Sequence, residues 1–117
     1  MGYTRHHAII VTSFDDELLQ QAHTQAVELG MSVTPIISGA VNFYSTFLVG
    51  PDGSKEGWDE SDKGNEQRAE FTDWLDQQRH NDDSSNLDWA EVQYGDDDAH
   101  NYVVRDSDEH YRRRHGL

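Results

Sequence analysis

The chain has no cysteine, only two prolines and only two lysines among its 117 residues. The absence of cysteine excludes disulfide bonds and thiolate metal sites. No apolar run approaches the roughly 20 residues that a membrane-spanning helix needs. No apolar stretch typical of a signal peptide stands at the start of the sequence. We therefore expect a soluble protein of the cytoplasm that makes no contact with a membrane.

Acidic residues are abundant: 23 Asp and Glu stand against nine Lys and Arg, which gives a formal net charge of −14. This balance disfavours direct binding of nucleic acid, because phosphate recognition needs a basic surface. Three interpretations stay open. The acid can serve as a solubilising surface, as an adaptation to high salt in which ions screen the charges, or as a surface that meets a basic partner and mimics nucleic acid. An excess of Asp with little Lys fits the high-salt interpretation.

The first thirty residues predict a strand followed by a helix. The run His7–Thr12 has apolar residues on both faces of a strand, which suits a central strand that is covered on both faces or one that is flanked by neighbours. Ser13 is placed to cap the helix, acidic residues follow in the first turn, and Gly30 supplies the C-terminal stop. The apolar stripe of this helix, at helical spacing, is Leu18, Leu19, Ala22, Ala26 and Leu29.

The middle of the chain predicts three further strands. One begins near Val33, where Pro35 indicates an edge strand, the start of the strand or a bulge, and the length of the connection favours parallel pairing with the first strand. Phe43–Val49 is the strongest strand, and a Pro-Asp-Gly turn after it predicts that Lys55–Trp58 pairs back as an extra short strand. By period two, the core-facing side of the strongest strand carries Phe43, Ser45, Phe47 and Val49.

The remaining elements complete a β-α-β-β-α-β order. A second helix is predicted over Glu66–His80, and Asp88–Tyr94 with His100–Arg105 alternate as a C-terminal hairpin. We expect an α+β fold: a ferredoxin-like two-layer sandwich with an extra short central strand and this hairpin. The predicted single domain covers residues 1–105, and residues 106–117 form a charged C-terminal tail.

Seven histidines raise the questions of metal binding and acid–base chemistry. His6 or His7 could meet His100 and an Asp if the first and last strands pair, but the spacing matches no metal pattern. His7 and His100 also stand in segments similar to those of two-histidine phosphoesterases. There, however, Ile9 and Tyr102 occupy the positions of the phosphate-holding hydroxyls. The sequence contains neither a nucleophile elbow nor a phosphate loop. We assign no catalytic residue, no metal site and no cofactor.

The central hairpin gathers hydroxyl, amide and aromatic groups, and one of the two lysines follows close by. Such a set can stack on a small polar ligand, hydrogen-bond its edges and hold an anionic group. The alternative is that Tyr44 and Trp58 cover an exposed sheet face or pack in a homodimer. The candidate ligand-binding residues are Ser38, Asn42, Tyr44, Ser45, Thr46, Lys55 and Trp58.

Three segments carry a resemblance that covers most of the chain: HHAIIVTSFDDELL from residue 6, VGPDGSKEGWDESD from residue 49 and DWAEVQYGDDD from residue 88. They resemble a family of small hypothetical proteins encoded by tailed bacterial and archaeal viruses. The resemblance implies an accessory protein in the cytoplasm of an infected cell, where it would antagonise host defence, and it transfers no catalytic residue. With the Asp-rich composition it also implies a virus of a salt-loving host.

We therefore expect a non-enzymatic viral accessory protein, a homodimer, that binds and sequesters a small polar ligand such as a nucleotide-derived host immune signal. One alternative is an acidic protein–protein inhibitor or nucleic-acid mimic that acts on a basic host protein. The other is a His-dependent, phosphoesterase-like hydrolase. We expect a binding protein rather than an enzyme.

Overall fold

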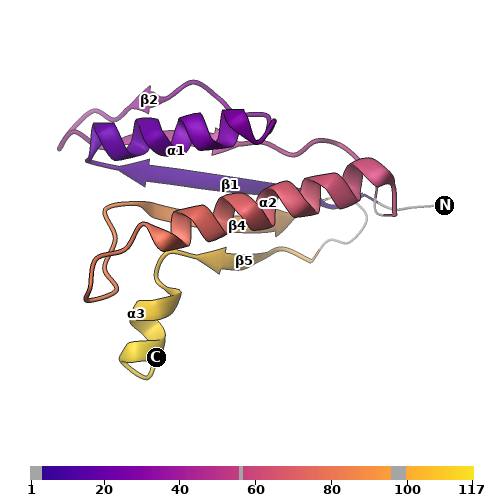
Figure 1. Cartoon of the computed structure of the whole chain (residues 1–117). Coiled ribbons are helices and arrows are strands. Elements are labelled where there is room, and N and C mark those ends of the chain that lie inside the picture. Colours follow the sequence, from indigo (N-terminus) through magenta and orange to yellow (C-terminus); the bar gives the residue numbers. More distant parts are fainter. Residues whose placement is uncertain (1–3, 56, 96–99) are drawn as a thin grey trace.

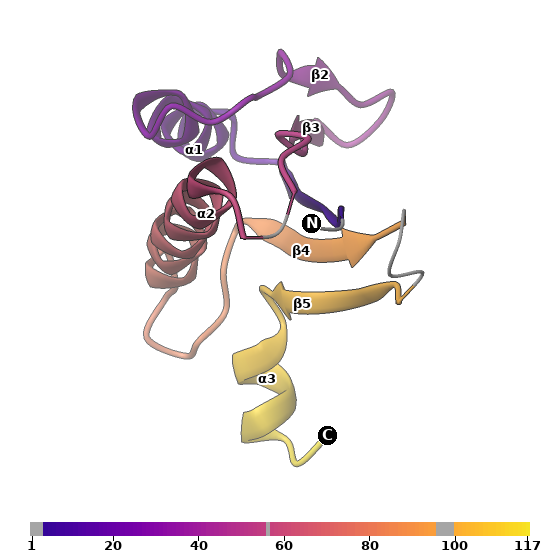
Figure 2. The same cartoon turned by 90° about the vertical axis from the view of Figure 1, so that its right-hand side faces the viewer.

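The computed structural model describes residues 4–55, 57–95 and 100–117, which form an α+β protein (Figure 1). A five-stranded antiparallel sheet carries α1 and α2 side by side on one face, and α3 projects beyond the last strand at the C-terminus (Figure 2). The α+β class expected from the sequence is confirmed. The elements are β1 (His6–Ser13), α1 (Asp16–Glu28), β2 (Ile37–Ser38), β3 (Ser45–Val49), α2 (Asp59–Gln77), β4 (Asp88–Tyr94), β5 (Tyr102–Asp106) and α3 (Glu109–Arg114).

The strands lie in the order β2-β3-β1-β4-β5, and every neighbouring pair is antiparallel. β1 is the central strand, where Ile9 lies opposite Val49 of β3 on one side and opposite Glu91 of β4 on the other. The predicted parallel pairing of β1 with the strand after α1 is wrong. β2 and β3 close as a local hairpin, and β3 then takes the place beside β1.

The strand order does not match the exact ferredoxin-like topology with an extra central strand that the sequence predicted. In the described part of Lys55–Trp58 no strand forms: Lys55 makes only an isolated bridge with Thr4, and Trp58 precedes α2. Glu56 lies outside the described residues. The second strand is short because Pro35 cannot donate a ladder hydrogen bond, so Val33 makes a single bridge before β2 begins. The C-terminal hairpin of β4 and β5 is formed as predicted.

The hydrophobic core lies between the sheet and the two long helices (Figure 2). Strand residues of alternating position point into it, as the period of a half-buried strand requires. The predicted inward positions Ser45, Phe47 and Val49 of β3 are all buried. The buried apolar residues of this core are Ile9, Val11, Leu19, Ala22, Ala26, Phe47, Val49, Phe71, Leu75, Leu87 and Trp89.

The two long helices begin at different residues from those predicted. The N-cap of α1 is Asp15, whose Oδ1 accepts a hydrogen bond from the Leu18 N–H at 3.1 Å. The Ser13 hydroxyl instead donates to the Asn86 carbonyl at 2.6 Å and ties β1 to the loop before β4. α2 begins at Asp59 rather than Glu66, because three carboxylates in its first turn complement the helix dipole and offset the weak helix propensity of Gly64.

Candidate protein-binding site

One face of the sheet is not covered by any described helix, and we call it the outer face (Figure 2). Side chains alternate along a strand, so the outer face carries the residues between the core positions. Ile10 lies at its centre, directly opposite Leu48 on one side and Ala90 on the other. Its described members are His6, Ala8, Ile10, Thr12, Ile37, Thr46, Leu48, Asp88, Ala90, Val92, Tyr94, Val103 and Asp106.

The outer face is largely apolar along the middle of its strands and leaves large side chains in water, whereas Asp88 and Asp106 lie beside this apolar region. Ile10 is 43% exposed, Val103 is 53% exposed and Ile37 is 64% exposed. Toward one end of the face, Thr12 and Thr46 lie opposite each other, and their hydroxyls form a hydrogen bond at 2.9 Å. An exposed apolar surface on a strongly charged protein is a candidate for an interaction site.

The outer face continues past the last paired residues into a group of aromatic side chains. Phe14 follows β1 and Tyr44 precedes β3, and their rings meet edge to face with 5.9 Å between centroids. Beside them Val41 is 71% exposed and Phe43 is 85% exposed. We call this group the aromatic end; it consists of Phe14, Val41, Asn42, Phe43 and Tyr44.

The backbone of the aromatic end is strained. Asn42 and Phe43 have φ of 60° and 61°, in the left-handed region that residues other than glycine rarely adopt. The Gly39 N–H donates to the Tyr44 carbonyl at 2.6 Å and closes the turn, and a Cβ on Gly39 would stand 2.4 Å from that oxygen. The predicted core position of Phe43 is therefore wrong, because the turn points its ring away from the protein.

A shallow hollow of about 490 Å³ opens at the aromatic end. It is lined by four of its residues together with Asp16, in the first turn of α1. Asp15 and Glu17 add two more carboxylates at the same helix terminus. The site thus combines exposed aromatic rings with an acidic border, and it contains no described Lys or Arg in its lining.

The structure divides the ligand-binding residues predicted from the sequence between the two ends of the sheet. Ser45 pairs with Ser13 at one end of β1, whereas Lys55 bridges Thr4 before its other end. Thr4 and Ser13 are nine positions apart in the chain, which corresponds to about 30 Å in an extended backbone. Ser38, Asn42 and Tyr44 lie with Ser45, Thr46 lies on the outer face, and Lys55 and Trp58 lie at the far end.

Two of these residues are also unsuited to a common ligand site for local reasons. Ser45 is only 8% exposed and faces the core, so its hydroxyl does not line the outer face. Lys55 places its ammonium 5.9 Å from the centre of the Trp58 ring, and these two residues form a separate cation–π pair. The seven predicted residues therefore do not surround one ligand.

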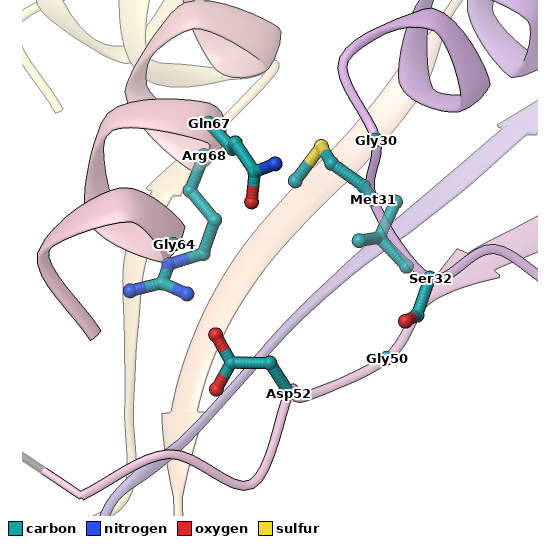
Figure 3. A pocket seen from close by; sticks show the side chains of 9 residues that line it. Gly30, Met31, Ser32, Gly50, Asp52, Gly64, Gln67 and Arg68 are labelled. Carbon is teal, nitrogen blue, oxygen red and sulfur yellow. The ribbon is translucent and has the colours of Figure 1, made fainter. Parts of the chain in front are cut away.

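A small cleft of about 60 Å³ lies between α2 and the loops that follow α1 and β3 (Figure 3). Asp52 points across it toward Arg68, and Gln67 donates to the Leu29 carbonyl at 2.7 Å. Burial tends to raise the pKa of Asp52, but hydrogen bonds from Ser54 and the charge of Arg68 lower it overall. These contacts hold the two loops against α2, and we interpret the cleft as a structural joint.

Charged residues also pack between α2 and the last two strands. Arg105 donates to Asp73 at 2.8 Å and to the Thr72 hydroxyl at 3.0 Å, and its guanidinium lies 5.8 Å from the Trp89 ring centre. Glu91 is only 9% exposed, and its burial raises its pKa although Arg68 and Arg105 oppose that shift. This network fastens α2 to β4 and β5.

The histidines predicted as candidates for metal or phosphoester chemistry do not form a described cluster. His7 lies on β1 opposite Gln93 of β4, and His100 precedes β5, so β4 runs between them. Among residues 4–55, 57–95 and 100–117, no group of three or more His, Asp and Glu is placed to hold a metal ion. Asp96–Asp98 lies outside the described residues.

Sequence reasoning missed the parts of the aromatic end that are most exposed: Phe14, Val41 and Phe43. One signal for Phe43 was present. Asn tolerates positive φ, so Asn42 could have indicated that the chain turns before the strand begins. Phe14 follows the last residue of β1 and continues the alternation of the outer face. The prediction that Ser13 caps the helix assigned Phe14 to the first turn of that helix instead.

The chain matches no protein-family model, no curated protein and no solved structure in the comparisons. The resemblance to small viral proteins therefore stays a prediction. Within the described ranges, every helix is too short or too polar to cross a lipid bilayer.

Proposed function

We propose that this chain is a non-enzymatic binding protein whose aromatic end docks into an apolar pocket of a basic partner protein. The observation that supports the proposal is Phe43, which is 85% exposed on a left-handed turn. A residue with a strained backbone of this kind lowers the stability of the fold by about 1–3 kcal/mol. Such residues persist where the surrounding structure holds them in place, and they cluster at functional sites. An unburied Phe also forgoes about 1.5–3 kcal/mol of hydrophobic stabilisation.

The acidic border supports a basic partner. Protein interfaces centre on a few aromatic anchors, surrounded by a polar rim that remains hydrated. Asp15, Asp16 and Glu17 form such a rim beside Phe14 and Tyr44. The net charge of −14 would steer a basic partner toward this surface and repel an acidic one. The proposal follows the protein–protein alternative raised by the sequence and assigns it to one end of the sheet.

A small ligand is the second candidate, and the hollow itself favours it. A volume of about 490 Å³ suits a small molecule that stacks on Phe43 or Tyr44 and hydrogen-bonds to the Asn42 amide. Asp16 in the lining disfavours a phosphate, and Lys55 lies about 30 Å away along the sheet. A neutral or cationic aromatic compound therefore fits the hollow better than a nucleotide-derived signal.

Photo-crosslinking tests the proposal. Benzoylphenylalanine replaces Phe14 in the full chain, and the protein is irradiated in an extract of its native cell. We expect a crosslinked basic protein whose yield falls when salt is added, because ions screen the acidic rim. The yield should be lost in Phe43→Ser and retained in Val27→Ser, a matched control that is 51% exposed on α1.

Equal yields in the two variants would show that Phe43 does not anchor the partner and would overturn the proposal. Absence of any crosslinked protein, together with calorimetric binding of a neutral aromatic compound that Phe43→Ser abolishes, would replace it with the small-ligand function.

A further inference from the structure

We infer that two copies of this chain associate back to back through the middle of the outer face. The contact residues are Ile10, Leu48, Val92 and Val103, which we call the central patch. They come from β1, β3, β4 and β5, which are neighbours in the sheet. Ile10 and Val103 are 43% and 53% exposed, and the other two are half-buried. The inference concerns a different surface from the aromatic end and stands independently of the proposed function.

The position of the central patch suits a two-fold interface. A two-fold axis presents the same residues on both partners, so the patch must be complementary to itself. Ile10 lies on β1, the central strand, with two strands on each side. An axis near Ile10 would lay one sheet across the other, as in a two-sheet sandwich whose layers pack about 10 Å apart.

The distribution of charge selects a second copy as the occupant. α1 carries three carboxylates and α2 carries seven, all on the opposite side of the sheet from the central patch (Figure 2). A basic partner would be drawn to those helices. The four central-patch residues are uncharged, so a like-charged partner is tolerated there better than on the helices, although Asp88, Asp106 and Asp108 line a hollow together with Ile10 and Val103. Back-to-back packing also keeps the two acidic helix layers as far apart as possible.

The available area predicts a weak dimer. The 27 residues of the five strands, each about 3.3 Å long and about 4.8 Å wide, give a flat area of about 430 Å² per copy. Two copies would bury roughly 900 Å², which is below the size of a stable specific interface and suits a weak one. Asp88 lies opposite Thr12, and Asp106 lies opposite Ala90 in the same row as Ile10, so both add like-charge repulsion to the interface. We therefore expect a concentration-dependent dimer that salt strengthens.

Sedimentation velocity of the full chain over a range of protein concentrations tests the inference. The expected result is a shift of the sedimenting mass from 13.4 kDa to twice that value as the protein concentration rises. In about 1 M salt the shift should occur at a lower protein concentration, because ions screen the repulsion between the acidic copies almost completely. Ile10→Lys should remain monomeric, because a partly exposed Lys can reach water in the monomer but would be buried in the dimer. Val27→Lys, on the helix face, should dimerise like the wild type.

Ile10→Thr is a milder second variant that preserves a β-branched strand residue. We expect its dissociation constant to rise about tenfold, because each copy loses part of a buried apolar side chain. Circular dichroism confirms folding in every variant, and Phe43→Ser should dimerise normally. A wild-type chain that stays monomeric in high salt, or a dimer that Ile10→Lys and Ile10→Thr leave unchanged, would overturn the inference.

Discussion

Phe14 and Tyr44 contact each other edge to face across the ends of β1 and β3, with 76° between their ring planes. Ser13 and Ser45 are the last paired residues of these strands, so the two rings extend the sheet register by one more pair. Such a contact contributes about 0.5–1.5 kcal/mol. Phe43 is therefore exposed on a turn whose next residue, Tyr44, is held in place by its contact with Phe14.

Replacement of Phe43 by glycine should raise the free energy of unfolding by about 1 kcal/mol. Glycine adopts φ near 61° without the steric cost that a side chain imposes, and an 85% exposed ring leaves little packing to lose. Urea denaturation measures the change. Phe47→Ala is the contrasting variant, because Phe47 is fully buried and its truncation should cost about 3–5 kcal/mol. A Phe43→Gly protein that unfolds more easily than the wild type would show that the ring supports the fold.

The cap of α1 gives a prediction that separates Asp15 from the serine that the sequence suggested. Asp15→Ala should lower the free energy of unfolding by about 1 kcal/mol, because the Leu18 N–H loses its acceptor. Asp15→Asn keeps an oxygen at the same place and should retain most of the stability. A loss of equal size in both variants would point to the charge of Asp15 rather than to its hydrogen bond.

Glu91 should make stability fall as the pH rises. Burial raises its pKa above 4.5, so the folded state favours the protonated acid more than the unfolded state does. That contribution is present below the unfolded pKa and is lost as the pH rises through the folded pKa. The unfolding free energy of Glu91→Gln minus that of the wild type should therefore increase as the pH rises from about 4 to 7.

Urea denaturation of the wild type and Glu91→Gln at several pH values measures this difference. The lowered pKa of Asp52 has the opposite effect on stability, because the stabilisation by Asp52 is lost as the pH falls through its folded pKa. This contribution is the same in both proteins and cancels in the difference. A difference that shrinks with rising pH would mean that the charge of Arg68, 3.8 Å from Glu91, outweighs burial.

The joint at Gly64 predicts coupling between a helix and a loop. Gly64→Ala should gain helix stability of up to about 1 kcal/mol. In the wild type a new Cβ would stand 2.6 Å from Asp52 Oδ2 and 3.2 Å from Arg68 Nη1, so the Asp52 side chain must move. The gain should appear in full only in an Asp52→Ala background. A double-mutant cycle by urea denaturation measures the coupling, and identical effects in both backgrounds would contradict it.

The sequence predicted correctly the strands and helices whose apolar residues recur at the spacing of the buried positions. The continuous apolar run of β1 predicted a strand, and β1 is the central strand with neighbours on both sides. Its apolar residues are not all buried, because Ile10 is exposed on the outer face. The stripe of α1 and the alternation of Asp88–Tyr94 gave correct elements as well. Trp89 and Glu91 share the buried face of β4, where α2 supplies Arg68 as a charged neighbour.

The candidate site could be predicted only in part, because it depends on pairing between distant segments. Tyr44 and Asn42 were recognised as surface residues, but nothing local indicated that Lys55 bridges Thr4 at the other end of the sheet. The exposure of Phe43 depends on two consecutive left-handed residues, and propensity alone assigns an aromatic residue to a strand. Which strand lies beside β1 likewise depends on tertiary packing.

The most direct test of the docking proposal uses the four phenylalanines of the chain. Phe14 and Phe43 are 50% and 85% exposed, whereas Phe47 and Phe71 are fully buried and act as internal controls. With 4-fluorophenylalanine at all four positions, a soluble paramagnetic agent should broaden only the two exposed fluorine resonances. Saturation with the protein recovered by crosslinking should restore the sharp Phe14 and Phe43 resonances and leave Phe47 and Phe71 unchanged. A Phe43 resonance that stays equally broad in the saturated complex would contradict docking through the aromatic end.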